Sequence, residues 1–206
     1  MSEVPVTLDL FVEDAGHQLL IEALIRRVAR DEAIAIVPRT QSARGGHGRV
    51  LVELELSFKL RAQPSDLLVV AIDANCKGWN KARGEIEGLI PAGRYLATAI
   101  ACPDPHVERW YLADPSSLAK SALEVKVKSE RRKCKKDHYK HILEDAFRSA
   151  GHPIRLGGIE FALEIVEVMD LYRAGKNEPS LAQFIEGLRA GLRLAKSSRG
   201  VRRSDT

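Results

Sequence analysis

The stretch "LLVVAIDANCKGWN" (Leu67–Asn80) decides the expected fold. Its first six residues are apolar and rich in Leu and Val, which is typical of a strand buried on both faces of a parallel sheet. An acid, Asp73, follows this run directly. Because open parallel sheets bind their ligands at the carboxyl ends of their strands, the stretch predicts a ligand site at Asp73.

Hydrophobic patterns on either side predict a regular alternation of strand and helix. Apolar runs predict strands at Val6–Val12, Ala33–Val37, Leu67–Ile72 and Tyr95–Ala101. Helical spacing predicts helices at His17–Arg30, Arg49–Leu60, Trp79–Ile90, His138–Ala150, Ile159–Tyr172 and Leu181–Leu194. The segment Arg49–Leu60 alternates like a strand, but its place between two strands favours a crossover helix. We therefore expect an α/β fold, a roughly four-stranded parallel sheet flanked by helices, with an α-helical C-terminal extension.

Composition is that of a globular chain, with 45% hydrophobic and 29% charged residues among 206. We expect an α/β domain at residues 1–120, a helical extension packed on it at 121–195, and a basic, disordered tail at 196–206. No apolar run approaches the roughly 18 residues that a membrane span needs, and the N-terminus has no basic leader.

The cysteines are three in number, at wide and unequal spacing: Cys76, Cys102 and Cys134. This pattern fits neither a zinc site nor a disulfide framework, which favours a reducing compartment. Together with the absence of a membrane span, it predicts a cytoplasmic protein.

Basic residues are concentrated in the second half of the chain. Residues 1–100 hold 12 of the 32 Lys and Arg residues and 13 of the 28 Asp and Glu residues, so the positive excess lies beyond residue 100. Such clusters attract nucleic-acid backbones, although a solvated helix face is the alternative. The candidate contacts are Arg131, Arg132, Lys133, Lys135 and Lys136, with Arg49 and Lys77 near the predicted strand ends.

Acids follow two of the predicted strands. Glu13 and Asp14 follow the first strand, and Asp73 follows the third. If these strands are neighbours, about 4.8 Å apart, the carboxylates converge and repel one another. A hard divalent cation such as Mg²⁺ would offset that repulsion, and carboxylate sites of this kind support phosphodiester chemistry. The alternative is that each acid only caps the helix that follows it.

These motifs resemble the Toprim domain of topoisomerases, primases and OLD-type nucleases. "LFVEDAGHQLLIEAL" (Leu10–Leu24) stands where Toprim proteins carry a strand, Glu-Gly and a helix, and "VVAIDANCKG" (Val69–Gly78) stands where they carry a strand and Asp-x-Asp. "HVERWYLAD" (His106–Asp114) is similar to a segment found in small stand-alone Toprim-like proteins, which are often encoded beside ATPases in prokaryotic defence loci.

The resemblance implies a nuclease that depends on Mg²⁺ or Mn²⁺. It implies Glu13 and Asp73 as primary metal ligands, Asn75 as a weaker one, and Glu108 and Asp114 as candidates for a second metal. It further implies an antiviral defence role with an ATPase partner of the ABC, OLD or SMC type. The chain could also form a homo-oligomer.

Three positions depart from the Toprim pattern. Asp14 replaces the glycine after the key Glu, Asn75 replaces the second Asp of Asp-x-Asp, and His17 stands where OLD-type members carry an acid. Fewer anionic ligands weaken Mg²⁺ binding, and an imidazole suits Mn²⁺ better.

Two other functions compete with the nuclease. A non-catalytic Toprim-like subunit would bind a partner protein or nucleic acid, and the replacements at positions 14 and 75 favour it. A receiver domain would use Asp73 as its phosphoacceptor. The 59 positions between Asp14 and Asp73, and the lack of a Pro-containing loop after Asp73, weigh against a receiver.

Overall fold

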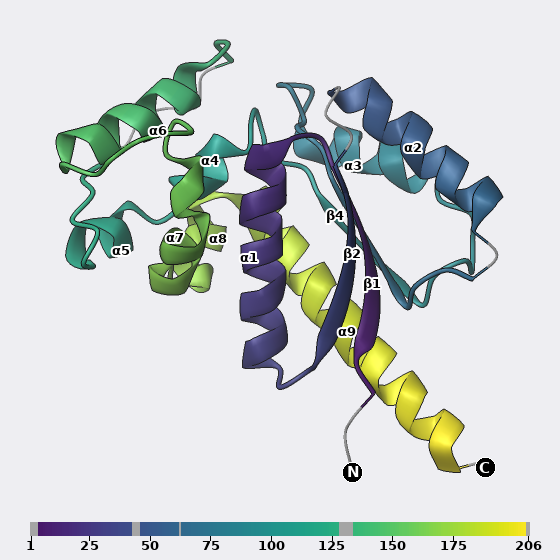
Figure 1. Ribbon diagram of the computed structural model, residues 1–206. Coiled ribbons are helices and arrows are strands. Elements are labelled where there is room, and N and C mark those ends of the chain that lie inside the picture. Colours follow the sequence, from purple (N-terminus) through teal and green to yellow (C-terminus); the bar gives the residue numbers. More distant parts are fainter. Residues whose placement is uncertain (1–3, 43–45, 62, 128–133, 205–206) are drawn as a thin grey trace.

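A four-stranded, all-parallel sheet forms the centre of the molecule, with strand order β2-β1-β3-β4 (Figure 1). The computed structural model describes residues 4–42, 46–61, 63–127 and 134–204, and side chains as far as residue 199. The strands are β1 (Val6–Val12), β2 (Ile36–Ser42), β3 (Leu67–Ala71) and β4 (Ala97–Ala101). The expected fold class, an α/β fold with a parallel sheet and a helical C-terminal part, is confirmed.

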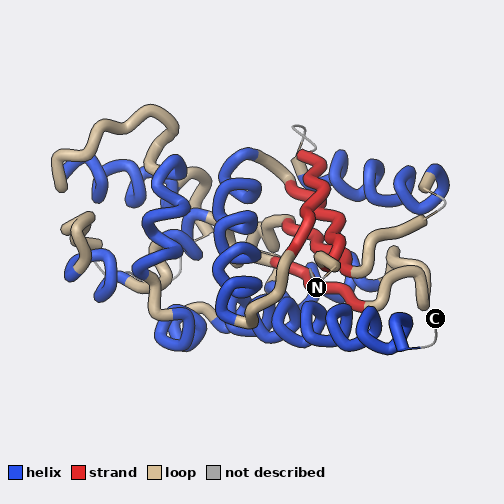
Figure 2. The backbone as a smooth tube through the Cα atoms, turned by 60° about the horizontal axis from the view of Figure 1, so that its bottom comes forward, coloured by secondary structure: helices blue, strands red, loops and turns tan. Residues whose placement is uncertain are grey.

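Helices cover both faces of this sheet (Figure 2). Their bounds are α1 (Ala15–Asp31), α2 (His47–Leu60), α3 (Trp79–Glu87), α4 (Glu108–Tyr111), α5 (Pro115–Lys120), α6 (His138–Ser149), the 3₁₀ turn η1 (Ile159–Phe161), α7 (Ala162–Val168), α8 (Leu171–Asn177) and α9 (Pro179–Ser204). Helices α1 and α9 lie on one face and α2 and α3 on the other, while α5 and α6 lie beyond α1 (Figure 1). The segment Arg49–Leu60 is thus the crossover helix that its place in the order predicted.

Strand β3 is buried on both faces, as its apolar sequence predicted. Leu67 and Val69 belong to the core that includes α1 and α9, whereas Leu68 and Val70 belong to the core that includes α2 and α3. All four side chains have no exposed surface. Asp73, which follows this strand, therefore lies at the carboxyl edge of the sheet.

Helix α9 packs unusually close to the sheet at Gly191. A Cβ atom at this position would lie 2.7 Å from Cδ1 of Leu67 in β3 and 3.2 Å from Cβ of Ala97 in β4. The glycine permits the close approach, and the helix covers the half of this face that α1 leaves open.

Two predicted elements have wrong bounds. The second strand runs over Ile36–Ser42 instead of Ala33–Val37. Ala33 has a φ of 50°, and the N–H of Ile34 donates to the carbonyl of Ala29. Both residues therefore belong to the turn that follows α1. The predicted helix Ile159–Tyr172 is divided into η1, α7 and α8. Met169 is extended, and Asp170 starts α8 by accepting a hydrogen bond from the backbone of Arg173.

The part of the expected disordered tail that the structure describes, residues 196–204, is instead the end of α9. Arg199 donates to the carbonyl of Pro5 at 2.5 Å and forms an ion pair with Asp66, which also binds Thr7. These contacts attach the helix to the start of β1. Among the described residues, no helix is long and apolar enough to cross a membrane.

Candidate metal centre

Glu13 and Asp73 meet at the carboxyl edge of the sheet. Their strands are hydrogen-bonded neighbours with Val12 opposite Ala71, so each acid leaves its strand at the same level. Oε2 of Glu13 accepts a hydrogen bond from the backbone N–H of Asp73 at 3.1 Å. In this strand order the crossovers leave in opposite directions between β1 and β3, which is the ligand-binding position of doubly wound sheets.

His17 completes the cluster from the first turn of α1. Asp14 is the N-cap of this helix, and its Oδ1 accepts from the backbone N–H of His17 at 3.0 Å and contacts Nδ1 of the ring at 2.9 Å. Nε2 of the same ring lies 3.0 Å from Oδ1 of Asp73. The imidazole is fully buried and joins two carboxylates, one from each strand end.

The donor atoms of Glu13, His17 and Asp73 all lie within 4.8 Å of one another, so the cluster could hold a metal ion. Two adjacent ligands of an octahedral ion with bonds of about 2.1 Å are about 3.0 Å apart. The distance between Nε2 of His17 and Oδ1 of Asp73 has this value. Asp14 can hold the proton on Nδ1, which leaves Nε2 as a ligand, an arrangement usual for metal-bound histidines.

Charges in the cluster are strongly coupled. Burial disfavours a charged His17, but the charge of Asp73 and the hydrogen bonds to Asp14 and Asp73 outweigh burial and raise its pKa to about 10. Burial also opposes ionisation of Asp14, yet contact with His17 lowers the pKa of Asp14 to about 2. The pKa of Asp73 is lowered in the same way, against burial, by His17 and His106. Without a metal, the ring is an imidazolium that neutralises part of the acidic charge.

A second histidine, His106, contacts the other oxygen of Asp73. Its Nδ1 lies 3.1 Å from Oδ2, and the side chain is about a quarter exposed, at 24%. Its hydrogen bond with Asp73 raises the pKa of His106 against burial. His106 was not among the predicted site residues, because only the acids of "HVERWYLAD" were candidates as metal ligands. The position of His106, shortly after the fourth strand, was the available signal.

A pocket of about 580 Å³ opens beside Asp73. It lies between the sheet edge and the start of α6, and its lining residues are Asp14, Asp73, Asn75, Cys76, His106, Glu108, Cys134, Lys136, Asp137 and Lys140. The pocket thus combines acids on the sheet side with two lysines near α6.

The other predicted metal ligands differ in their positions. Glu108 lines the pocket, and burial raises its pKa. Asn75 also lines it, and its Nδ2 donates to the carbonyl of Asp73 at 3.3 Å. Asp114 has a structural role instead: it caps α5 and accepts two hydrogen bonds from Arg173, at 2.7 and 2.9 Å. Both of its oxygens are engaged there, and it does not line the pocket, so we no longer count it as a metal ligand.

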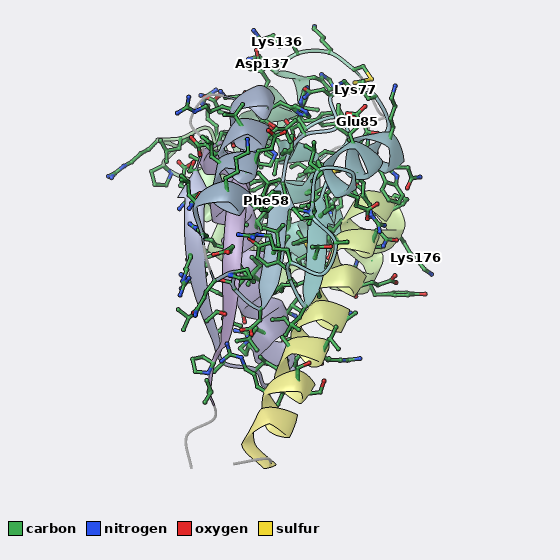
Figure 3. All side chains as sticks on the ribbon, turned by 90° about the vertical axis from the view of Figure 1, so that its right-hand side faces the viewer. Phe58, Lys77, Glu85, Lys136, Asp137 and Lys176 are labelled. Atoms are coloured by element: carbon green, nitrogen blue, oxygen red, sulfur yellow. A yellow bond between two sulfur atoms is a disulfide. The ribbon has the colours of Figure 1, made fainter. Side chains whose placement is uncertain are left out.

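Of the four predicted basic contacts that the structure describes, two lie at or beside the pocket and two do not. Lys136 lines the pocket and Lys135 is exposed beside it, whereas Lys77 lies 3.9 Å from Glu85 outside the lining (Figure 3). Arg49 forms a 3.0 Å ion pair with Glu53 on α2. Arg131, Arg132 and Lys133 lie outside the described residues.

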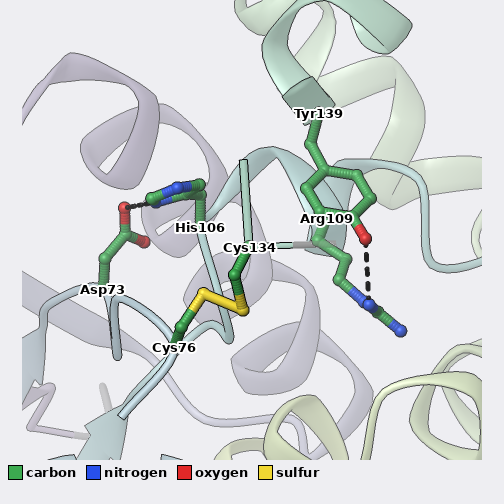
Figure 4. The surroundings of a disulfide bond; sticks show 6 residues. All are labelled: Asp73, Cys76, His106, Arg109, Cys134 and Tyr139. Carbon is green, nitrogen blue, oxygen red and sulfur yellow. Dashed lines mark hydrogen bonds and ion pairs between the residues drawn. A yellow bond between two sulfur atoms is a disulfide. The ribbon is translucent and has the colours of Figure 1, made fainter. Parts of the chain in front are cut away.

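A disulfide joins Cys76 to Cys134 at the pocket (Figure 4). The expectation that the cysteines form no disulfide is wrong, and the argument for a reducing compartment loses its basis. Their separation of 58 positions gave no sign of pairing, because only the fold brings the turn after β3 to the segment before α6. The two Cα atoms are 5.9 Å apart, within the usual range for a disulfide.

Comparison with protein-family models, with curated proteins and with solved structures found no match to this chain. The resemblance to Toprim proteins therefore stays a prediction that rests on the motifs themselves. Chemically, the cluster offers two carboxylates and a buried imidazole, and Asp73 connects it to the pocket. This arrangement suits either a divalent ion or a positively charged histidine.

Proposed function

We propose that this protein is a metal-dependent phosphodiesterase of the Toprim type that cleaves DNA or RNA. The observation that carries the proposal is the convergence of Glu13, His17 and Asp73 within 4.8 Å at the edge of a parallel sheet. This edge opens on a pocket that holds a further acid, Glu108, and a lysine, Lys136. Oxygen ligands around a divalent ion are the common equipment for hydrolysing phosphodiesters.

Glu13, Asp73 and His17 would hold the ion, and Asn75 offers an amide oxygen nearby. A bound divalent ion supplies a Lewis acid for the phosphate and lowers the pKa of water. The imidazole ligand favours Mn²⁺ over Mg²⁺, because Mg²⁺ prefers an all-oxygen shell. Lys136 and Lys140 lie across the pocket from Asp73, where their charges would attract the phosphates of a strand.

The biological setting follows from the resemblance alone. We propose an antiviral effector that works with an ATPase partner. Nucleic acid would enter between the sheet edge and the start of α6, where Lys135 and Lys136 are exposed.

The decisive experiment measures cleavage of single- and double-stranded DNA and RNA with Mn²⁺ or Mg²⁺. Asp73→Asn and Glu13→Gln should each abolish cleavage, because each replaces a ligand carboxylate by a neutral amide of the same shape. The control Asp145→Asn changes an exposed acid on α6 and should cleave like the natural protein. Cleavage that persists in excess chelator, or in Asp73→Asn, would refute the proposal.

The second candidate is a non-catalytic subunit that binds nucleic acid or a partner. It is favoured by one observation: the positive charge of His17 already satisfies Asp14 and Asp73 without a metal. Calorimetric titration with Mn²⁺ distinguishes the two candidates. A nuclease should show a heat of Mn²⁺ binding that Glu13→Gln removes, whereas a non-catalytic subunit should show no such heat. A receiver function gains no support, since both oxygens of Asp73 are engaged by histidines.

A further inference from the structure

The Cys76–Cys134 disulfide connects the two walls of the pocket beside Asp73. Cys76 belongs to the turn that follows β3, one residue after Asn75, and Cys134 precedes α6 by four residues. Both cysteines line the pocket, as do Asn75 and Lys136, their respective neighbours on the two walls. The covalent bond therefore links the wall with Asp73 and Asn75, here called the acidic wall, to the wall with Lys136, Asp137 and Lys140, here called the basic wall.

Each wall has its own attachment to the protein. The turn after β3 is held by backbone hydrogen bonds from Ala74 to Pro103 at 2.7 Å and from Asn75 to Pro105 at 3.1 Å. Helix α6 is held through the buried side chains of Tyr139, Leu143 and Phe147. Each element therefore has contacts of its own that hold it in place. The disulfide mainly determines the position of residues 134–137.

Residues 134–137 are all exposed. Asp137, the N-cap of α6, is in the left-handed region with a φ of 56°, and its side chain makes no capping hydrogen bond. Backbone hydrogen bonds tie this segment to α6, because the N–H groups of His138 and His141 donate to the carbonyls of Lys135 and Asp137 at 3.2 and 3.0 Å. Without the disulfide, the segment would be held by α6 alone, and Lys136 would lose its fixed position in the pocket.

The disulfide is also accessible to a reductant. Cys134 is exposed, so an external thiolate can reach its sulfur. The third cysteine, Cys102, is buried, and burial raises the pKa of its thiol to about 12. Cys102 is therefore a poor nucleophile for internal exchange, and reduction requires an external thiol.

We propose that reversible reduction of the Cys76–Cys134 disulfide by an external thiol or dithiol controls the pocket beside Asp73. Two thiols supply two electrons and two protons, the sulfur–sulfur bond breaks, and the products are two cysteine thiols and one disulfide of the reductant. In the oxidised protein the basic wall is held opposite Asp73, and in the reduced protein it is released. The effect on catalysis rests on the proposed function, whereas the redox-dependent release does not.

Hydrogen exchange measured by mass spectrometry tests the release directly. The protein is compared oxidised and after reduction with a phosphine, and alkylation followed by intact mass confirms the redox state. The amides of His138 and His141, which donate to the carbonyls of Lys135 and Asp137, should exchange several-fold faster after reduction, while the turn after β3, β1 and α9 keep their protection. Equal exchange in both states would overturn the proposal.

Three variants sharpen this test. Cys76→Ser and Cys134→Ser should both exchange as the reduced protein does, with or without reductant. Cys102→Ala should keep the full redox response, since this residue is outside the disulfide. A redox response that survives in Cys76→Ser, or that disappears in Cys102→Ala, would contradict the assignment.

Mn²⁺ titration and cleavage in both redox states then separate this inference from the proposed function. Redox-dependent exchange without metal binding or cleavage would support the proposed release of the basic wall and contradict the proposed nuclease function. Metal-dependent cleavage with identical rates and exchange in both states would support the nuclease and reject the release.

Discussion

His17 is the residue on which the character of the site depends. Its two ring nitrogens contact Asp14 and Asp73, and the ring has no access to solvent. A proton and a metal ion would compete for the same nitrogen, Nε2, because Asp14 retains the proton on Nδ1. The side chain is thus either the positive charge of the cluster or a ligand in it, and Asp14 orients the ring in both cases.

Replacing Asp14 by Ser tests this orienting role. Serine preserves an N-cap oxygen for α1, but the loss of the carboxylate that pairs with buried His17 should lower the free energy of unfolding of the metal-free protein. Loss of the carboxylate at Nδ1 should weaken Mn²⁺ binding by about 10- to 100-fold, the usual effect of removing such a partner. Calorimetric titration gives the affinity and urea unfolding gives the stability. Unchanged Mn²⁺ affinity would show that His17 is not a ligand.

Sequence reasoning identified individual residues only where their chemistry was conspicuous. It placed Glu13 and Asp73 together because acids at the ends of two buried strands are rare and topologically informative. It missed His106, whose role arises from a loop that reaches back to Asp73, and it missed the disulfide. Both depend on contacts between distant segments, and only His106 had a local signal, its position shortly after the fourth strand.

At the scale of elements, strong hydrophobic periodicity predicted which helices and strands form. It did not predict the residues at which they begin and end. Strand β3 and helix α6 were expected close to where they lie because of their apolar spacing, whereas α2 alternates like a strand and was predicted from its place between two strands. The start of β2 and the division between α7 and α8 depend on single residues, namely Ala33 with its positive φ and the N-cap Asp170. Such local interactions override the average preference of a segment.

Two glycines of α9 provide a matched pair of substitutions. Gly191→Ala would place a methyl group 2.7 Å from Leu67, so we expect a loss of about 1–3 kcal/mol from overpacking. Gly187→Ala meets no atom within 4 Å, and we expect a gain of about 0.5–1 kcal/mol because alanine favours helices. Urea denaturation measures both, and equal effects of the two changes would contradict the close packing of α9.

Across the whole molecule, much of the C-terminal basic charge is used internally. Arg193 binds Glu32, Lys196 donates to the carbonyl of Ala33, and Arg199 pairs with Asp66. These residues attach α9 to the end of α1 and to the start of β1. These basic side chains therefore contribute to holding the last helix in place.

Acid stability provides a global test through Asp114. Burial opposes its ionisation, but hydrogen bonds with Arg173 lower its pKa from 3.8 to about 2. Its stabilising contribution, about 2 kcal/mol, is therefore complete above the unfolded pKa and is lost as the pH falls through the folded value. Asp114→Asn should lower the free energy of unfolding by this amount at pH 7 and by almost nothing near pH 2.

Urea unfolding at several pH values measures this difference. Asparagine can still cap α5, so the comparison isolates the charge. A difference that stays constant from pH 7 to pH 2 would show that the ion pair with Arg173 does not stabilise the protein.

The position of α9 has a consequence for synthesis of the chain. This helix covers β3 and β4 through the close contact at Gly191, yet the ribosome makes it after all four strands. A nascent chain that has already paired its four strands leaves Leu67 and Ala97 uncovered until Pro179–Ser204 emerges. Such exposed apolar surface is a binding site for chaperones, so the final helix governs when the growing polypeptide can leave their protection.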